Sequence, residues 1–321
     1  MQIYGVGASL VNVHQLQCGF NNFSLLRNVY RLDTSDGQQL VCRISCAPHY
    51  PVDLIERQSA FAMLLLANGV PTPQKLCAAE FYCIRWPQAE SELHVTLETY
   101  MGSDLESADL DTFNTLGSLV GQMHVAAQKH PAHLGFSTTA RDILTGRACY
   151  ANILRRAHAL PQTSAIRDAT RLHDALVSIL RPMWNKLPRG AVHGDMGIYN
   201  NLVSSHKGLA VIDFNLAGDE VFLGDLLATY YSSIHKYNWQ DRLINIDRPA
   251  AKKVFLAGYV AHRKLTMLEE QNFLTIAALF DGLFYSKAAI ERWNESPIPT
   301  SLTHFEKVSA LFEAGFASST H

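Results

Sequence analysis

Residues 191–203 read AVHGDMGIYNNLV and contain the pattern H-G-D-x-x-x-x-N. The pattern places Asp195 five residues before Asn200, and Asp213 follows within the run Ile212-Asp213-Phe214. Taken alone, His-Gly-Asp is a simple turn in many proteins, so any chemistry depends on the combination. Phosphoryl transfer needs a carboxylate that orients and deprotonates the attacking hydroxyl, and oxygen ligands that hold Mg²⁺ against the phosphates. The spacing therefore suggests Asp195 as the base, with Asn200 and Asp213 as metal ligands.

Two extended runs upstream predict a β-hairpin. Residues 28–33 (NVYRLD) and 40–45 (LVCRIS) flank TSDGQQ, whose Asp36-Gly37 pair tolerates the positive φ of tight turns. From residue 52 to 67 apolar residues recur at helical spacing, and Asn68-Gly69 followed by prolines supplies a stop signal. The runs FYCIRW (81–86) and HVTLETY (94–100) add further strands. Together these segments predict a small antiparallel sheet with one helix.

After residue 104, apolar residues recur at helical spacing over long segments, as in Phe113, Leu116, Val120, Met123 and Ala127. The helical region is interrupted by β-like runs near residues 190–214. We therefore expect an α+β chain with two lobes, residues 1–101 and residues 102–321, and a hinge between them.

The composition excludes some classes of function. The net charge of −2 does not indicate a basic surface for nucleic acid or an anionic membrane. The sequence contains no run of about 18 apolar residues, so it predicts no membrane-spanning helix. The amino-terminal residues lack the features of a secretory signal, so we expect a cytoplasmic protein. The spacing of the six cysteines is irregular, which favours free thiols over a metal site.

With these motifs in this order, the chain resembles the aminoglycoside phosphotransferase and choline kinase superfamily, whose fold is similar to that of protein kinases. The resemblance implies an ATP-dependent, Mg²⁺-requiring kinase that phosphorylates a hydroxyl of a small molecule. It implies that Asp195 is the catalytic base and that Asn200 and Asp213 bind metal. It also implies that Asp225, twelve residues after Asp213, braces the catalytic loop.

The resemblance extends to the amino-terminal lobe. It implies that Arg43 contacts the phosphates of ATP and that Glu56, on the predicted helix, pairs with Arg43. The run Leu97-Glu98-Thr99-Tyr100-Met101-Gly102 is similar to the hinge of the family. There the backbone groups of Glu98 and Tyr100 would hold adenine.

The sequence indicates the phosphate acceptor less clearly than it indicates the reaction. The predicted carboxy-terminal helices carry acidic and aromatic residues that suit a cationic amine: Asp219, Glu220, Tyr230, Tyr231, Trp239, Asp281, Tyr285 and Trp293. The same residues also fit an ordinary helical core with a solvated face. An amino alcohol, an amino acid and an aminoglycoside remain open as acceptors.

Two alternatives belong to other classes of function. A catalytically silent, nucleotide-binding regulator would fit the departures from the family pattern at Asn215 and at residues 219–222. A Ser/Thr protein kinase is disfavoured, because no long activation segment with an A-P-E-like end follows Asp213. Retention of the base and both metal ligands favours an active small-molecule kinase.

Overall fold

The fold is described here from a computed structural model of the chain. The residues that it describes are 2–17, 27–46, 51–87, 92–135, 163–199, 202–205, 208–235, 243, 246–295 and 299–319. The chain forms two compact units. The first unit comprises Met1–Asp104, Ala132–Gly135 and Val203–Asn215, and the second comprises Leu105–Pro131, Phe136–Leu202 and Leu216–His321.

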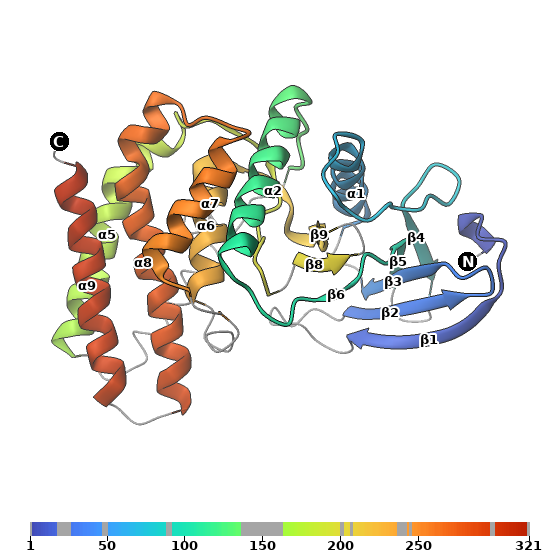
Figure 1. The fold of residues 1–321 in the computed structure, drawn as a ribbon, viewed down its shortest axis with the longest axis horizontal. Coiled ribbons are helices and arrows are strands. Elements are labelled where there is room, and N and C mark those ends of the chain that lie inside the picture. Colours follow the sequence, from blue (N-terminus) through green and yellow to red (C-terminus); the bar gives the residue numbers. More distant parts are fainter. Residues whose placement is uncertain are drawn as a thin grey trace. The chain divides into compact units, whose positions relative to one another are not determined.

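The first unit is built on an antiparallel five-stranded sheet with the strand order β1-β2-β3-β5-β4 (Figure 1). Its strands are β1 (Leu10–Gln17), β2 (Arg27–Thr34), β3 (Gln39–Cys46), β4 (Cys83–Pro87) and β5 (Glu92–Thr99). A short 3₁₀ helix, Gln2–Tyr4, precedes them. Apolar side chains of this unit, including Leu32, Leu40 and Leu97, form a buried cluster beneath the sheet. The predicted antiparallel sheet is confirmed, and β1 is an additional strand that the sequence analysis did not predict.

The predicted hairpin is formed by β2 and β3, which pair from Asp33 opposite Gln39 onward. Gly37 has a φ of 83°, a conformation that glycine adopts without steric cost. The N–H of Gly37 donates to the carbonyl of Thr34 at 3.0 Å and closes the turn. The Asp36-Gly37 signal therefore identified the turn correctly.

The helix α1 (Val52–Ala67) has the bounds that its apolar spacing predicts. Its buried face includes Phe61 and Leu65, and the ring of Phe61 packs edge-on against Phe214 at 6.2 Å between centroids. Gly69, at a φ of 84°, ends the helix as the Asn68-Gly69 pair predicts.

A later segment of the chain completes the first unit. It contains β8 (Leu202–Ser205) and β9 (Gly208–Val211), and β8 pairs with β6 (Ser103–Asp104). The N–H of Val211 donates to the carbonyl of Pro71 at 2.8 Å. Gly102 is required here, because a Cβ at this position would lie 1.9 Å from the carbonyl oxygen of Ser204. This packing fixes the segment that carries Asp213 within the first unit.

The second unit is mainly helical, as predicted. Its helices in the described part of the chain are α2 (Leu110–Lys129), α5 (Ser164–Trp184), α6 (Phe222–His235), α7 (Arg248–Val260), α8 (Met267–Glu295) and α9 (Pro299–Ser319). The strands β7 (Arg189–Val192) and β10 (Gly218–Val221) pair antiparallel. In Figure 1, α5, α8 and α9 lie side by side, in agreement with their contacts.

The apolar spacing predicted for α2 faces the core, since Phe113, Leu116, Val120 and Met123 are fully buried. Asp109 caps the amino end of α2 by accepting a hydrogen bond from the N–H of Thr112 at 2.9 Å.

In the part of the chain that the structure describes, no helix is long and apolar enough to cross a membrane. Among the described residues, Cys42, Cys46, Cys77 and Cys83 form no disulfide bond.

Candidate active site

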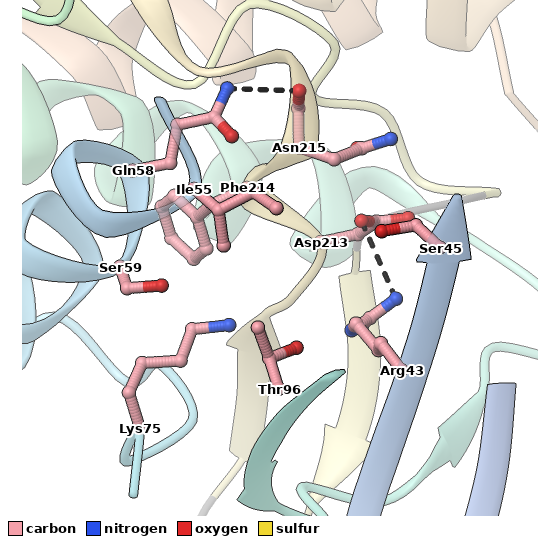
Figure 2. Close-up of a pocket in the computed structure, with 10 residues that line it drawn as sticks. All are labelled: Arg43, Ser45, Ile55, Gln58, Ser59, Lys75, Thr96, Asp213, Phe214 and Asn215. Atoms are coloured by element: carbon pink, nitrogen blue, oxygen red, sulfur yellow. Dashed lines mark hydrogen bonds and ion pairs between the residues drawn. The ribbon is translucent and has the colours of Figure 1, made fainter. Parts of the chain in front are cut away.

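The first unit contains a pocket of about 540 Å³, part of it open to solvent, beside the predicted phosphate-binding residue (Figure 2). Side chains from β3, α1, the segment between α1 and β4, β5 and the 213–215 segment surround it: Arg43, Ser45, Ile55, Gln58, Ser59, Lys75, Thr96, Asp213, Phe214 and Asn215. Two of the predicted site residues, Arg43 and Asp213, therefore share one pocket.

Four charged residues form a connected group at this pocket, which we call the Arg43 cluster: Arg43, Lys75, Glu98 and Asp213. Arg43 donates to Oε1 of Glu98 from Nε at 2.9 Å, and its Nη2 lies at the same distance from this oxygen. The other oxygen of Glu98 pairs with Nζ of Lys75. Nη1 of Arg43 lies 3.5 Å from Oδ1 of Asp213. Arg43, Lys75 and Asp213 line the pocket, while the buried Glu98 lies behind this lining, and the two cations balance the two carboxylates.

The two ends of the Arg43 cluster differ in burial. The side chains of Glu98 and Lys75 are 2% and 8% exposed, whereas those of Arg43 and Asp213 are 16% and 24% exposed. Burial alone would raise the pKa of the Glu98 carboxyl, but Arg43 and Lys75 outweigh burial and hold this pKa below its usual range. Glu98 is therefore an ionised anchor, while Arg43 and Asp213 face the open side.

Glu56 does not form the predicted pair with Arg43. Its two carboxylate oxygens accept hydrogen bonds from the backbone N–H groups of Tyr82 and Cys83, at 3.1 and 2.7 Å. Successive residues of a helix differ in direction by about 100°. With Ile55, Gln58 and Ser59 facing the pocket, Glu56 points about a quarter turn away from it. Glu98 takes the place at Arg43 that the sequence analysis assigned to Glu56.

The predicted adenine contacts also need correction. The N–H of Tyr100 donates to the carbonyl of Gln39 at 2.9 Å, so the prediction for Tyr100 now depends on its carbonyl oxygen. Glu98 lies within β5, opposite Val41 of β3, and forms a bridge with Lys75 on its other side. Glu98 enters the site through its side chain and not through its backbone.

Asp213 has a left-handed backbone conformation, with a φ of 66°. Such a conformation costs a non-glycine residue roughly 1–2 kcal/mol, and residues of this kind are common at functional sites. The neighbouring carbonyl of Asn215 accepts a hydrogen bond from Nε2 of Gln58 at 2.9 Å (Figure 2). Contacts from α1 therefore hold the segment that presents the Asp213 carboxylate to the pocket.

The residues described at this pocket suit Mg²⁺ only as part of a larger ligand set. Asp213 supplies a partly exposed carboxylate, the hard oxygen donor that Mg²⁺ prefers. No group of three or more His, Cys, Asp or Glu residues in the described ranges could hold a metal alone. Mg²⁺ in kinases is usually bound by one or two protein oxygens together with phosphates and water. Asn200, the second predicted ligand, lies outside the described residues.

Asp195 lies in the second unit, half-buried, at a cavity of about 210 Å³. Residues 194–196 and residues of α6 and α8 surround this cavity: Gly194, Asp195, Met196, Asp225, Ala228, Thr229, Ser232 and Phe284. The predicted base therefore faces a space beside hydroxyl and apolar side chains.

A buried series of polar contacts, the Asp225 network, supports the loop that carries Asp195: His124, Asp225, Tyr259, Arg263 and Glu269. One oxygen of Asp225 accepts a hydrogen bond from the N–H of Gly194 at 3.0 Å, and the other lies 3.0 Å from Nε2 of His124. This contact confirms the prediction that Asp225 braces the loop.

The network continues away from the loop. Nδ1 of His124 lies 3.0 Å from the hydroxyl of Tyr259, which accepts from Arg263 at 2.8 Å, and Arg263 pairs with Glu269. Burial lowers the pKa of His124, against the opposing effect of Asp225. A neutral imidazole that donates from Nε2 and accepts at Nδ1 satisfies both contacts. The helical spacing of the sequence gives no sign of this link.

The residues nominated for a cationic acceptor have other partners. Glu220 is 1% exposed and accepts from the indole N–H of Trp184 at 3.0 Å and from the N–H of Val221 at 2.7 Å. The hydroxyl of the buried Tyr230 donates to the carbonyl of Arg248, and Asp281 lies 2.5 Å from Nε2 of His235. Trp239 and the side chain of Trp293 lie outside what the structure describes. Glu220 is therefore a buried structural carboxylate rather than an acceptor contact.

The fold is that of kinase-like phosphotransferases. An amicoumacin kinase solved with AMP-PNP and Ca²⁺ matches with a TM-score of 0.65 at 15% identity, over 93% of this chain and 90% of that one. A microcompartment-associated aminopropanol kinase matches with a TM-score of 0.62 at 18% identity, over 95% and 90% of the two chains. An aminoglycoside phosphotransferase from Alicyclobacillus acidocaldarius matches with a TM-score of 0.58 at 12% identity, over 95% and 91%.

Residues 24–262 match the model of the phosphotransferase enzyme family, APH. The chain belongs to this family, as the H-G-D-x-x-x-x-N motif indicated. None of the curated protein sequences matches the chain.

Proposed function

We propose that this protein transfers the γ-phosphoryl group of ATP to a hydroxyl of a small molecule. The observation that carries the proposal is the side-by-side position of Arg43 and Asp213 at one pocket, 3.5 Å apart. A guanidinium suits phosphate oxygens, and an adjacent carboxylate suits the metal ion that accompanies them. Membership of the phosphotransferase family supports this assignment.

On the nucleotide side, Arg43 would donate hydrogen bonds to phosphate oxygens, and Asp213 with Asn200 would hold Mg²⁺. When bound, Mg²⁺ supplies positive charge that offsets the charge on the phosphates. The partial exposure of Arg43 and Asp213 leaves both side chains open to a ligand. The carbonyl of Tyr100 would contact adenine at the hinge.

On the acceptor side, Asp195 would orient the acceptor hydroxyl and take its proton at a carboxylate oxygen. The hydrogen bond from Gly194 to Asp225 supports this role, because it fixes the residue next to Asp195. A base held on a fixed loop has less freedom to lose when it aligns with the substrate.

The acceptor class is the finer part of the proposal. The cavity at Asp195 is partly open to solvent, so its volume does not select among an amino alcohol, an amino acid and an aminoglycoside. The likeness to an aminopropanol kinase, which shows only a shared fold, is a reason to test amino alcohols first.

The test is ADP release from the purified chain with ATP and Mg²⁺. The panel should contain amino alcohols, amino acids, aminoglycosides, neutral sugars and a serine-containing peptide. ADP release that depends on one small acceptor supports the proposal. Nucleotide binding without release for any acceptor would favour the silent regulator, and release with the peptide alone would favour the protein kinase.

A further inference from the structure

Arg43 lies between two carboxylates from different parts of the first unit. Glu98 of β5 contacts it at 2.9 Å, and Asp213 lies 3.5 Å away. The guanidinium contacts Glu98 through both Nε and Nη2, whereas only Nη1 lies near Asp213. Glu98 therefore holds Arg43 more closely than Asp213 does.

Glu98 is the more firmly held of the two. Val41 lies opposite Glu98 and Arg43 lies two residues further along β3, so Arg43 and Glu98 occupy diagonal positions on one face of the sheet. The second oxygen of Glu98 pairs with the buried Lys75. Lys75 therefore keeps Glu98 ionised and stationary at the inner end of the pocket.

We propose that Glu98, held by Lys75, is the positioning residue of the nucleotide site, and that it draws Arg43 away from Asp213 so that Asp213 can bind Mg²⁺. The proposal depends on the proposed function and deepens it. Without Glu98, Arg43 would keep Asp213 as a carboxylate partner and compete with Mg²⁺ for the same oxygens.

The test compares nucleotide binding by three variants of the full chain with that by the wild type. Glu98→Gln alone would leave Lys75 buried without its carboxylate, which could prevent folding. The double variant Lys75→Met with Glu98→Gln removes both charges and avoids this problem. Lys75→Met alone is the reference that isolates the loss of Glu98. Glu56→Gln removes a carboxylate of the same unit that accepts from the backbone N–H groups of Tyr82 and Cys83.

The measurement is the affinity for ADP by isothermal titration calorimetry at increasing Mg²⁺ concentrations. We expect the double variant to need about tenfold more Mg²⁺ for half-maximal affinity than Lys75→Met, the scale of one charge-assisted hydrogen bond. Glu56→Gln should lower the melting temperature and leave the Mg²⁺ requirement near that of the wild type. A merely structural role of Glu98 would lower stability without shifting the Mg²⁺ requirement.

Equal Mg²⁺ requirements in the double variant and in Lys75→Met would overturn the proposal, as would a shift in Glu56→Gln as large as that in the double variant. These outcomes differ from a failure of the proposed function. In that case the wild type, whether or not it binds ADP, would release no ADP from ATP with any acceptor of the panel.

Discussion

The Arg43 cluster and the Asp225 network use the same kinds of charged residue in opposite ways. In the Arg43 cluster the outer members, Arg43 and Asp213, are 16% and 24% exposed. In the Asp225 network no side chain that contributes to an ion pair is more than 4% exposed. Charges that are sealed on all sides can only support structure, whereas charges open on one side can exchange a protein partner for a ligand.

This contrast predicts where mutations act. Changes in the Asp225 network should reduce stability and the presentation of Asp195. Changes at the open end of the Arg43 cluster should alter the binding of nucleotide and metal and leave stability nearly unchanged. The following predictions test this division, from the largest effect to the smallest.

Asp195→Ala should reduce phosphoryl transfer by about 10²–10⁴-fold, the usual contribution of a general base. The affinity for ATP should stay nearly the same, because the base acts on the acceptor hydroxyl. Steady-state ADP release and calorimetric ATP binding measure the two effects separately. Asp168→Ala, at an exposed carboxylate on α5, is the control and should affect neither. Turnover by Asp195→Ala close to the wild-type rate would remove Asp195 from the mechanism.

Asp225→Ala should lower the free energy of unfolding by about 2–5 kcal/mol. It leaves two buried donors, the N–H of Gly194 and Nε2–H of His124, without their acceptor. Urea denaturation followed by circular dichroism measures this loss. Asp174→Ala, at a carboxylate that is 72% exposed, is the matched control. A loss no greater than that of the control would show that the network does not support the loop.

Asp213→Asn should raise the Mg²⁺ requirement on the order of a hundredfold, because an amide lacks the charge that offsets the cation. Asn200→Ala should act in the same direction with a smaller effect. The melting temperature of Asp213→Asn should stay close to that of the wild type, in contrast to Asp225→Ala. Titration of activity and of ADP affinity with Mg²⁺ checks both variants, and an unchanged requirement in both would rule out the assigned metal ligands.

The two units should also differ in their response to acid. Burial lowers the pKa of His124, His173 and His235 in the second unit below the ordinary value of 6.5. Below pH 6.5 the unfolded state therefore binds more protons than the folded state, and the stability of the second unit falls as the pH decreases. The lowered pKa of Glu98 acts later, since its contribution is lost only below the ordinary value of 4.5.

Hydrogen–deuterium exchange at pH 7 and pH 5.5 checks this difference. Peptides from α2, α5 and α6 should lose protection at pH 5.5, and peptides from β3 and β5 should keep it. Loss of protection in β3 and β5 first would contradict the assignment of acid sensitivity to the buried histidines.

Local patterns predicted most of the first unit. The Asp36-Gly37 turn and the apolar spacing of α1 are encoded within a few residues, so the sequence identified both. The strand β1 was missed because its two faces give no burial contrast: Val11, Val13 and Leu16 are all exposed. The strand β10 was not predicted, because a glutamate within it indicates a solvent-exposed segment. Glu220 is buried through a hydrogen bond from Trp184, a contact that no local pattern reveals.

The candidate site was predicted in part for a similar reason. Asp195, Asp213 and Asp225 stand at fixed offsets in one motif, so their grouping can be read from the sequence. The partner of Arg43 depends on the rotation of α1 and on a contact between Lys75 and Glu98 that only the folded chain creates. A lysine that follows the prolines of residues 71–73 reads as a solvated loop residue, and no sequence signal marks it as buried.

The first unit is assembled from segments that are far apart in the chain, and this has a consequence for the order of folding. The hydrogen bond from Gln58 to Asn215 joins residues 157 positions apart, and β6 pairs with β8 across much of the second unit's sequence. On the ribosome, the amino-terminal sheet and α1 emerge first, but the packing of Phe61 against Phe214 cannot form until residue 214 has been synthesised. The part of the molecule that begins to fold first therefore completes its packing late, and Phe61 lacks this partner until residue 214 has been synthesised.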